Sequence, residues 1–197
     1  YAVMFGTYFY HKRVRSAVSV FGSLFNNLFV LRKNSAGETI SQVKVPLSYA
    51  PKRNFISRLE AMNDGEQAER RVAIKLPRMS FEMTSLTYDG TRKTGMTQTF
   101  RAIDKASDTM RKVYMPVPYN VSFELSIMAK LSDDALQILE QIVPYFQPSF
   151  NITINLIDSI GEKKDIPIVL ESINYSDQYE GSFDTRRTII YTLSFTA

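Results

Sequence analysis

This chain is poor in histidine and cysteine, two residues often used in catalysis and metal binding. Its 197 residues include one histidine, His11, and no cysteine, which removes disulfides, thiolate nucleophiles and cysteine-ligated metals. Asp133 and Asp134 are adjacent carboxylates, but they stand at the start of a predicted helix, where negative charge stabilises the helix dipole. His11 has neither a nucleophile nor an orienting acid near it in the sequence. We therefore expect no catalytic residue and no metal ion.

Known catalytic and cofactor motifs are also missing from the sequence. It contains no GxGxxG, GxxxxGK[ST], HExxH or GxSxG pattern. An enzyme of an unrecognised type would need a convergent polar site, which the sequence does not show. We expect a protein that is not an enzyme and binds no cofactor.

Composition and length are those of a folded chain. Hydrophobic residues make up 44% and charged residues 22%, which is ordinary for a globular protein, and the length suits a single domain over residues 1–197. No apolar run reaches the roughly 18 residues that span a bilayer, and no secretory leader is visible. These features predict a soluble, cytoplasmic protein with no membrane contact.

Residues 131–151 are the stretch that organises the predicted fold. Apolar residues recur there at helical spacing, and Ser132 is the predicted N-cap. Pro144 and Pro148 then end the helix and form a corner. The corner residues are Tyr145, Phe146 and Gln147. Two interpretations of this corner stay open, packing at a subunit boundary and packing in the core.

The remaining pattern alternates strands with short helices. A helical stripe covers about 11–25, and a short helix follows Pro51. Predicted strands cover about 28–33, 38–49, 72–88, 121–130, 150–156, 166–174 and 189–195, with a turn at 161–164 and a polar connector at 176–187. The class is therefore α+β, a mainly antiparallel sheet with about three helices packed on one side and one long loop or hairpin excursion.

The excursion is a basic segment at residues 89–112, which we expect to project as a loop or arm. Long segments without clear periodicity are uncommon inside compact domains and are often functional. Its candidate contact residues are Arg92, Lys93, Arg101 and Lys105. A second basic patch at the first helix consists of Lys12, Arg13 and Arg15. For both patches, partner contact and a solvated surface remain alternatives.

A nucleic-acid-binding module using the basic patches at 12–15 and 92–112 is one functional hypothesis. It predicts DNA binding that weakens steeply with salt. The net charge of +4 is small for a chain whose main task is holding phosphates, and no helix-turn-helix, zinc or RNP signature is present.

Several strings point to a different hypothesis. They are MFGTYFY, VPLSYAPKRNF, LPRMSFEM, FELSIMAKLSDDALQILEQIVPYFQPSFN, KDIPIVL and RRTIIYTLSF. In this order they resemble the tail sheath stabiliser and completion proteins, or tail terminators, of T-even-type contractile-tailed phages. The similarity extends from Met4 to the end of the chain. Members of that family continue beyond the position that corresponds to Ala197.

The resemblance implies a virion structural protein without catalytic activity. Proteins of that family form a six-fold ring, so the resemblance implies such a ring here. It would cap the tail tube and sheath, stabilise the last sheath disc and offer an attachment surface to the head neck. The implied partners are further copies of the chain, the tail sheath protein, the tail tube terminator and head neck proteins. DNA would pass through the ring without specific binding. The implied location is the neck region of the tail, after assembly in the host cytoplasm.

Overall fold

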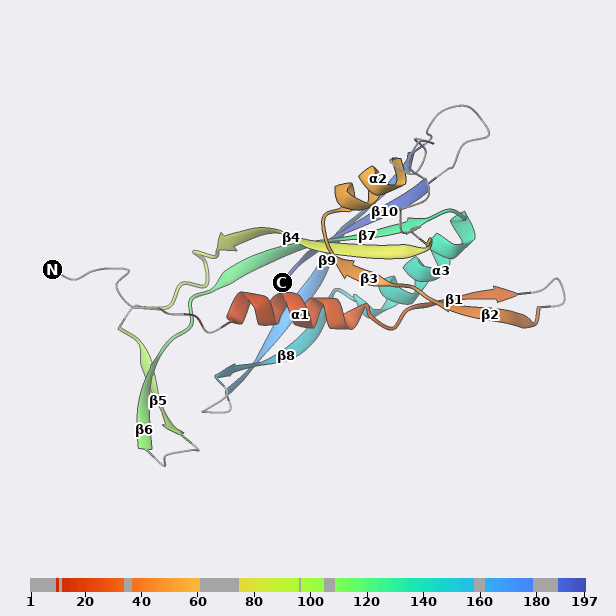
Figure 1. Ribbon diagram of the computed structural model, residues 1–197. Coiled ribbons are helices and arrows are strands. Elements are labelled where there is room, and N and C mark those ends of the chain that lie inside the picture. Colours follow the sequence, from red (N-terminus) through yellow and green to blue (C-terminus); the bar gives the residue numbers. More distant parts are fainter. Residues whose placement is uncertain are drawn as a thin grey trace.

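The computed structural model describes residues 10, 12–33, 37–60, 75–95, 97–104, 109–157, 162–178 and 188–197. Its centre is a six-stranded sheet in the order β3-β4-β7-β10-β9-β8 (Figure 1). In that order the strands are β3 (Leu47–Tyr49), β4 (Arg78–Tyr88), β7 (Tyr119–Ala129), β10 (Thr188–Thr196), β9 (Glu162–Gln178) and β8 (Ser149–Ile157). Neighbouring strands pair antiparallel except β3 and β4, which are parallel. The predicted α+β class with a mainly antiparallel sheet is confirmed.

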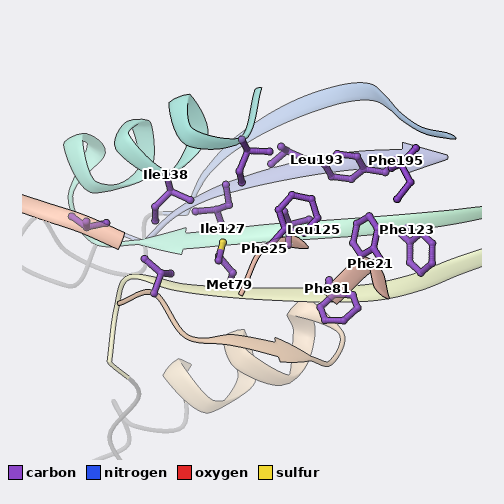
Figure 2. Packing of buried hydrophobic residues seen from close by; sticks show 14 residues of the cluster. Phe21, Phe25, Met79, Phe81, Phe123, Leu125, Ile127, Ile138, Leu193 and Phe195 are labelled. Carbon is purple, nitrogen blue, oxygen red and sulfur yellow. The ribbon is translucent and has the colours of Figure 1, made fainter. Parts of the chain in front are cut away.

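The core lies between this sheet and helix α1 (Arg13–Leu24). Alternate residues of β7 and β10 point to one face, so that Phe123 pairs across the strands with Phe195. Phe21 of α1 is buried and stacks on Phe123, with the ring centroids 4.3 Å apart. Figure 2 shows Phe21, Phe81, Phe123 and Phe195 packed together. This aromatic cluster fixes α1 on the sheet.

Helix α3 (Ser132–Ile142) covers the same face, and its buried Ile138 joins the same core. Helix α2 (Lys52–Glu60) lies on the other face, where Phe55 packs against Met128 and Ile190. The sequence predicted that the helices all pack on one side of the sheet. The structure instead has α1 and α3 on one face and α2 on the other. The reason is the two-residue period of β7. Met128 points away from its neighbour Ile127 and needs a cover of its own.

Two hairpins lie outside the central sheet. They are formed by β1 (Phe29–Lys33) with β2 (Thr39–Lys44) and by β5 (Thr99–Asp104) with β6 (Thr109–Tyr114). Figure 1 shows that they project at opposite ends of the molecule. The β5–β6 hairpin corresponds to the predicted excursion. Of the two forms expected for it, a loop or a hairpin, the structure has the hairpin, and its second strand ends at Tyr114 rather than at 112.

Some predicted boundaries were wrong. The strand expected at 38–49 is divided at Pro46, whose carbonyl accepts a hydrogen bond from the Met79 backbone N–H at 2.9 Å, so the chain leaves one sheet and joins another. Lys163 and Lys164, expected in a turn, lie in β9 opposite Asn155 and Ile154. The expected connector from 176 is still strand up to residue 178, because β10 pairs with it. Long-range pairing, which local composition does not reveal, decides each of these cases.

Candidate assembly surfaces

The corner after α3 divides into a buried and an exposed part. The helix continues as a 3₁₀ turn over Val143–Tyr145. Phe146 packs in the core, with its ring centroid 5.1 Å from that of Phe195 and 6.3 Å from that of Phe25. Tyr145 is 68% exposed, and Gln147 is exposed as well. Phe146 is therefore half-buried against the core, while Tyr145 and Gln147 are exposed at the surface.

An apolar pocket of about 150 Å³ opens beside Tyr145. It lies where the end of α1 meets α3 and β8. Its lining residues are Leu24, Phe25, Leu28, Gln141, Ile142, Tyr145, Phe146 and Phe150. Only Gln141 among them has a polar side chain that is not aromatic. The pocket therefore suits an apolar side chain better than a charged ligand.

Asp89 and Arg92 belong to a hydrogen-bonded cluster at the arm base, where the chain leaves β4 toward the β5–β6 hairpin. The Asp89 carboxylate accepts hydrogen bonds from the Thr91 hydroxyl at 2.6 Å, the Thr91 backbone N–H at 2.9 Å and Arg92 Nε. Arg92 also donates through Nη2 to Asn120 Oδ1 at 2.6 Å. The hydrogen bonds from Thr91 and Arg92 hold the pKa of Asp89 well below its usual value of 3.8. Arg92, predicted as a contact residue, is thus bonded within the chain to Asp89 and Asn120.

One face of the β5–β6 hairpin carries five exposed side chains, here called the arm face. It consists of Arg101, Ile103, Met110, Lys112 and Tyr114. The three uncharged side chains are between 61% and 68% exposed. Arg101 lies directly opposite Lys112, and Lys112 Nζ lies 5.7 Å from the centroid of the Tyr114 ring. The cations Arg101 and Lys112 therefore lie between the exposed pair of Ile103 and Met110 and the exposed Tyr114.

The other predicted basic residues that the structure describes are exposed at the surface. Lys93 is exposed near the arm base, and Lys105 lies outside the described residues. Lys12, with a left-handed φ of 55°, precedes α1, and Arg13 and Arg15 stand exposed in its first turn. In Figure 1 the beginning of α1 faces the end of the molecule that carries the β5–β6 hairpin. The two patches are therefore on the same side of the fold.

The α3 residues Gln137 and Gln141 hold the β1–β2 hairpin in place. Gln137 Oε1 accepts a hydrogen bond from the Leu31 backbone N–H at 3.1 Å. Gln141 accepts from the Phe29 N–H at 3.5 Å and donates to the Phe29 carbonyl at 2.8 Å. These amides satisfy backbone groups of the outer edge of β1. Sequence reasoning missed them, although two glutamines four residues apart on a helix flank are a visible signal.

The carboxylates at the start of α3 accept hydrogen bonds within the chain. Leu131, not the predicted Ser132, is the N-cap, and no side chain caps the helix. Asp134 is buried and accepts a hydrogen bond from Arg32 Nη2 at 3.1 Å, while Asp133 accepts one from Gln137 Nε2 at 2.8 Å. The described residues contain no group of three or more side chains that could hold a metal ion. None of their helices is long and apolar enough to cross a membrane.

Comparison with known proteins decides the family of this chain. Residues 8–197 match the family described as T4-like virus Myoviridae tail sheath stabiliser. The chain belongs to this family. The tail completion protein gp15 of Enterobacteria phage T4 is 34% identical to it over 197 residues, covering 98% of this chain and 71% of that protein. The predicted resemblance is thus confirmed, and the chain is a structural component of a T4-like phage tail.

A solved structure gives a much weaker match. It is a chain in the tail of an empty GTA particle refined with C6 symmetry, 14% identical, covering 62% of this chain and 75% of that chain. The TM-score is 0.23. A similarity of this size says nothing about how the present chain assembles.

Proposed function

We propose that the chain completes the tail as a closed six-fold ring that caps the tube and sheath, stabilises the last sheath disc and offers an attachment surface to the head neck. Family membership over residues 8–197 is the observation that carries this proposal. In it, the chain acts by binding other subunits, without catalysis. Its partners are further copies of itself, the tail sheath protein, the tail tube terminator and neck proteins, with DNA passing through the ring.

The shape of the molecule supports ring formation. A ring requires a heterologous contact, in which one surface of a subunit meets a different surface of the next. The two hairpins and the exposed flank of α3 supply distinct surfaces at opposite ends of the fold (Figure 1). Tyr145 and the apolar pocket beside it add a further surface of subunit-interface character.

Sheath retention tests this function directly. Tails assembled without their sheath stabiliser are incubated with the purified chain, and electron microscopy then measures the fraction that keep an extended sheath. We expect that fraction to rise with chain concentration until the tail ends are saturated. A chain that binds DNA but leaves the sheath unprotected would support the nucleic-acid-binding alternative and contradict the proposal.

A further inference from the structure

The arm face carries two opposed like charges and an exposed apolar pair, and neither arrangement stabilises a hairpin by itself. Arg101 and Lys112 are like charges directly opposite each other, an arrangement that destabilises a strand pair. No described carboxylate forms an ion pair with either of them. Ile103 and Met110 form the next cross-strand pair and are both mostly exposed. A surface that bears carboxylates beside an apolar side chain would satisfy all four residues.

The outer flank of α3 has that chemistry. Asp133, Leu136 and Glu140 follow one another at spacings of three and four residues, which places them on one side of a helix. All three are exposed, and Leu136 is 43% exposed. We call these three residues the α3 flank. The two carboxylates are seven positions apart, which corresponds to about 10 Å along a helix axis, with the leucine between them.

We propose that the arm face of one copy binds the α3 flank of the next copy. In this contact, Arg101 and Lys112 pair with Asp133 and Glu140, and Leu136 packs against Ile103 and Met110. This inference rests on the proposed ring and names the surfaces that close it.

Three observations favour a second copy as the partner. The charges of the two surfaces are opposite, and each includes exposed apolar side chains that the other can cover. The surfaces also lie at opposite ends of the molecule, as Figure 1 shows for the β5–β6 hairpin and α3. This placement is what head-to-tail closure needs. Nucleic acid would satisfy the two cations but would give no role to the pair of Ile103 and Met110.

Site-specific cross-linking tests the contact, and the absence of native cysteine removes background. Met110→Cys and Leu136→Cys are made as separate variants, because both side chains are exposed. The variants are mixed in equal amounts and treated with a short bismaleimide, both in concentrated solution and on tails lacking their own sheath stabiliser. We expect covalent dimers that contain one copy of each variant. The chain with both cysteines should give a ladder of linked copies. Ile40→Cys in place of Met110→Cys is the control and should give neither product.

Charge reversal tests the electrostatic part. Arg101→Glu with Lys112→Glu keeps two like charges opposite each other, so the hairpin itself is little affected. We expect at least a tenfold loss of assembly on tails. Adding Asp133→Lys and Glu140→Lys should restore it. Lys33→Glu with Lys75→Glu, the same charge change elsewhere on the surface, should leave assembly unchanged, and circular dichroism verifies that every variant is folded.

The outcomes separate this inference from the function on which it rests. Mixed dimers and restored assembly support the contact. Normal sheath protection by the arm variant, without mixed cross-links, would overturn the contact and leave the proposed function intact. Failure of the unmodified chain to protect sheaths would overturn both. Loss of DNA binding in the arm variant with no change in assembly would assign the arm face to nucleic acid.

Discussion

Gly22 and Phe81 determine how closely helix α1 approaches the sheet. A Cβ atom added at Gly22 would lie 2.6 Å from Cζ of Phe81, closer than real Cβ contacts allow. Phe81 belongs to the aromatic cluster around Phe21, so its ring cannot move without disturbing the core. At this position, the close packing that glycine allows stabilises the fold more than its low helix propensity destabilises it.

We predict that Gly22→Ala destabilises the chain, although alanine is the better helix former by about 1 kcal/mol. Overpacking against the Phe81 ring should cost about 1–3 kcal/mol, which after the alanine gain leaves a net loss of up to about 2 kcal/mol, measured by urea unfolding. Ser19→Ala, at an exposed position of the same helix, is the matched control and should change stability little. A Gly22→Ala variant as stable as the parent would show that Phe81 moves freely.

The second prediction at the residue scale concerns pH. The folded-state pKa of Asp89 is below its usual value of 3.8, so its contribution to stability is fully present above about pH 4 and is lost as pH falls further. Thr91→Ala should raise the pKa of Asp89 toward 3.8, because the Thr91 hydroxyl contributes most to the shift. Carbon-detected NMR titration measures the pKa, with Thr97→Ala as the control. A native Asp89 that titrates near 3.8 would contradict the arrangement at the arm base.

At the scale of elements, α3 connects the core to a hairpin that has little core of its own. β2 is exposed along its whole length, and isolated two-stranded hairpins are only marginally stable in water. The hydrogen bonds that β1 forms with Gln137 and Gln141, together with the ion pair between Arg32 and Asp134, hold β1 beside the helix. The projecting hairpin is thus stabilised mainly from one side.

We predict that Gln137→Ala combined with Gln141→Ala loosens the hairpin locally. Each lost hydrogen bond should cost about 0.5–1.5 kcal/mol, since water can reach these backbone groups, and amide hydrogen exchange at Phe29 and Leu31 should accelerate. Gln42→Ala on the exposed β2 is the control. Unchanged protection of both amides in the double variant would mean that other contacts hold β1.

Sequence reasoning recovered the elements better than their connections. Periodicity located α1, α3, β7 and β8, because apolar residues recur along one face of each. It did not show that Met128 needs α2 on the opposite face, that Pro46 joins two sheets or that β5 pairs with β6. Each of these depends on a partner distant in the sequence. Among the candidate contact residues, local composition did not distinguish Arg92, which Asp89 and Asn120 hold, from Arg101, which is exposed on the arm.

At the scale of the whole molecule, the chain presents different surfaces at its two ends. The arm face is basic and apolar, and the α3 flank is acidic and apolar. Repetition of such a contact by a constant rotation gives a closed ring when the rotation divides a full turn. The family to which the chain belongs stabilises tail sheaths, and a closed ring would bind every sheath subunit of the last disc at once.

The most direct measurement is cryo-electron microscopy of tails to which the purified chain has been added. The account predicts new density at the sheath end with six-fold symmetry. Copies of this fold should fit it with each arm against the neighbouring α3, and the total mass should be six times the 22.6 kDa of one chain. Tail ends that gain no density, or that gain density without a closed ring, would contradict it.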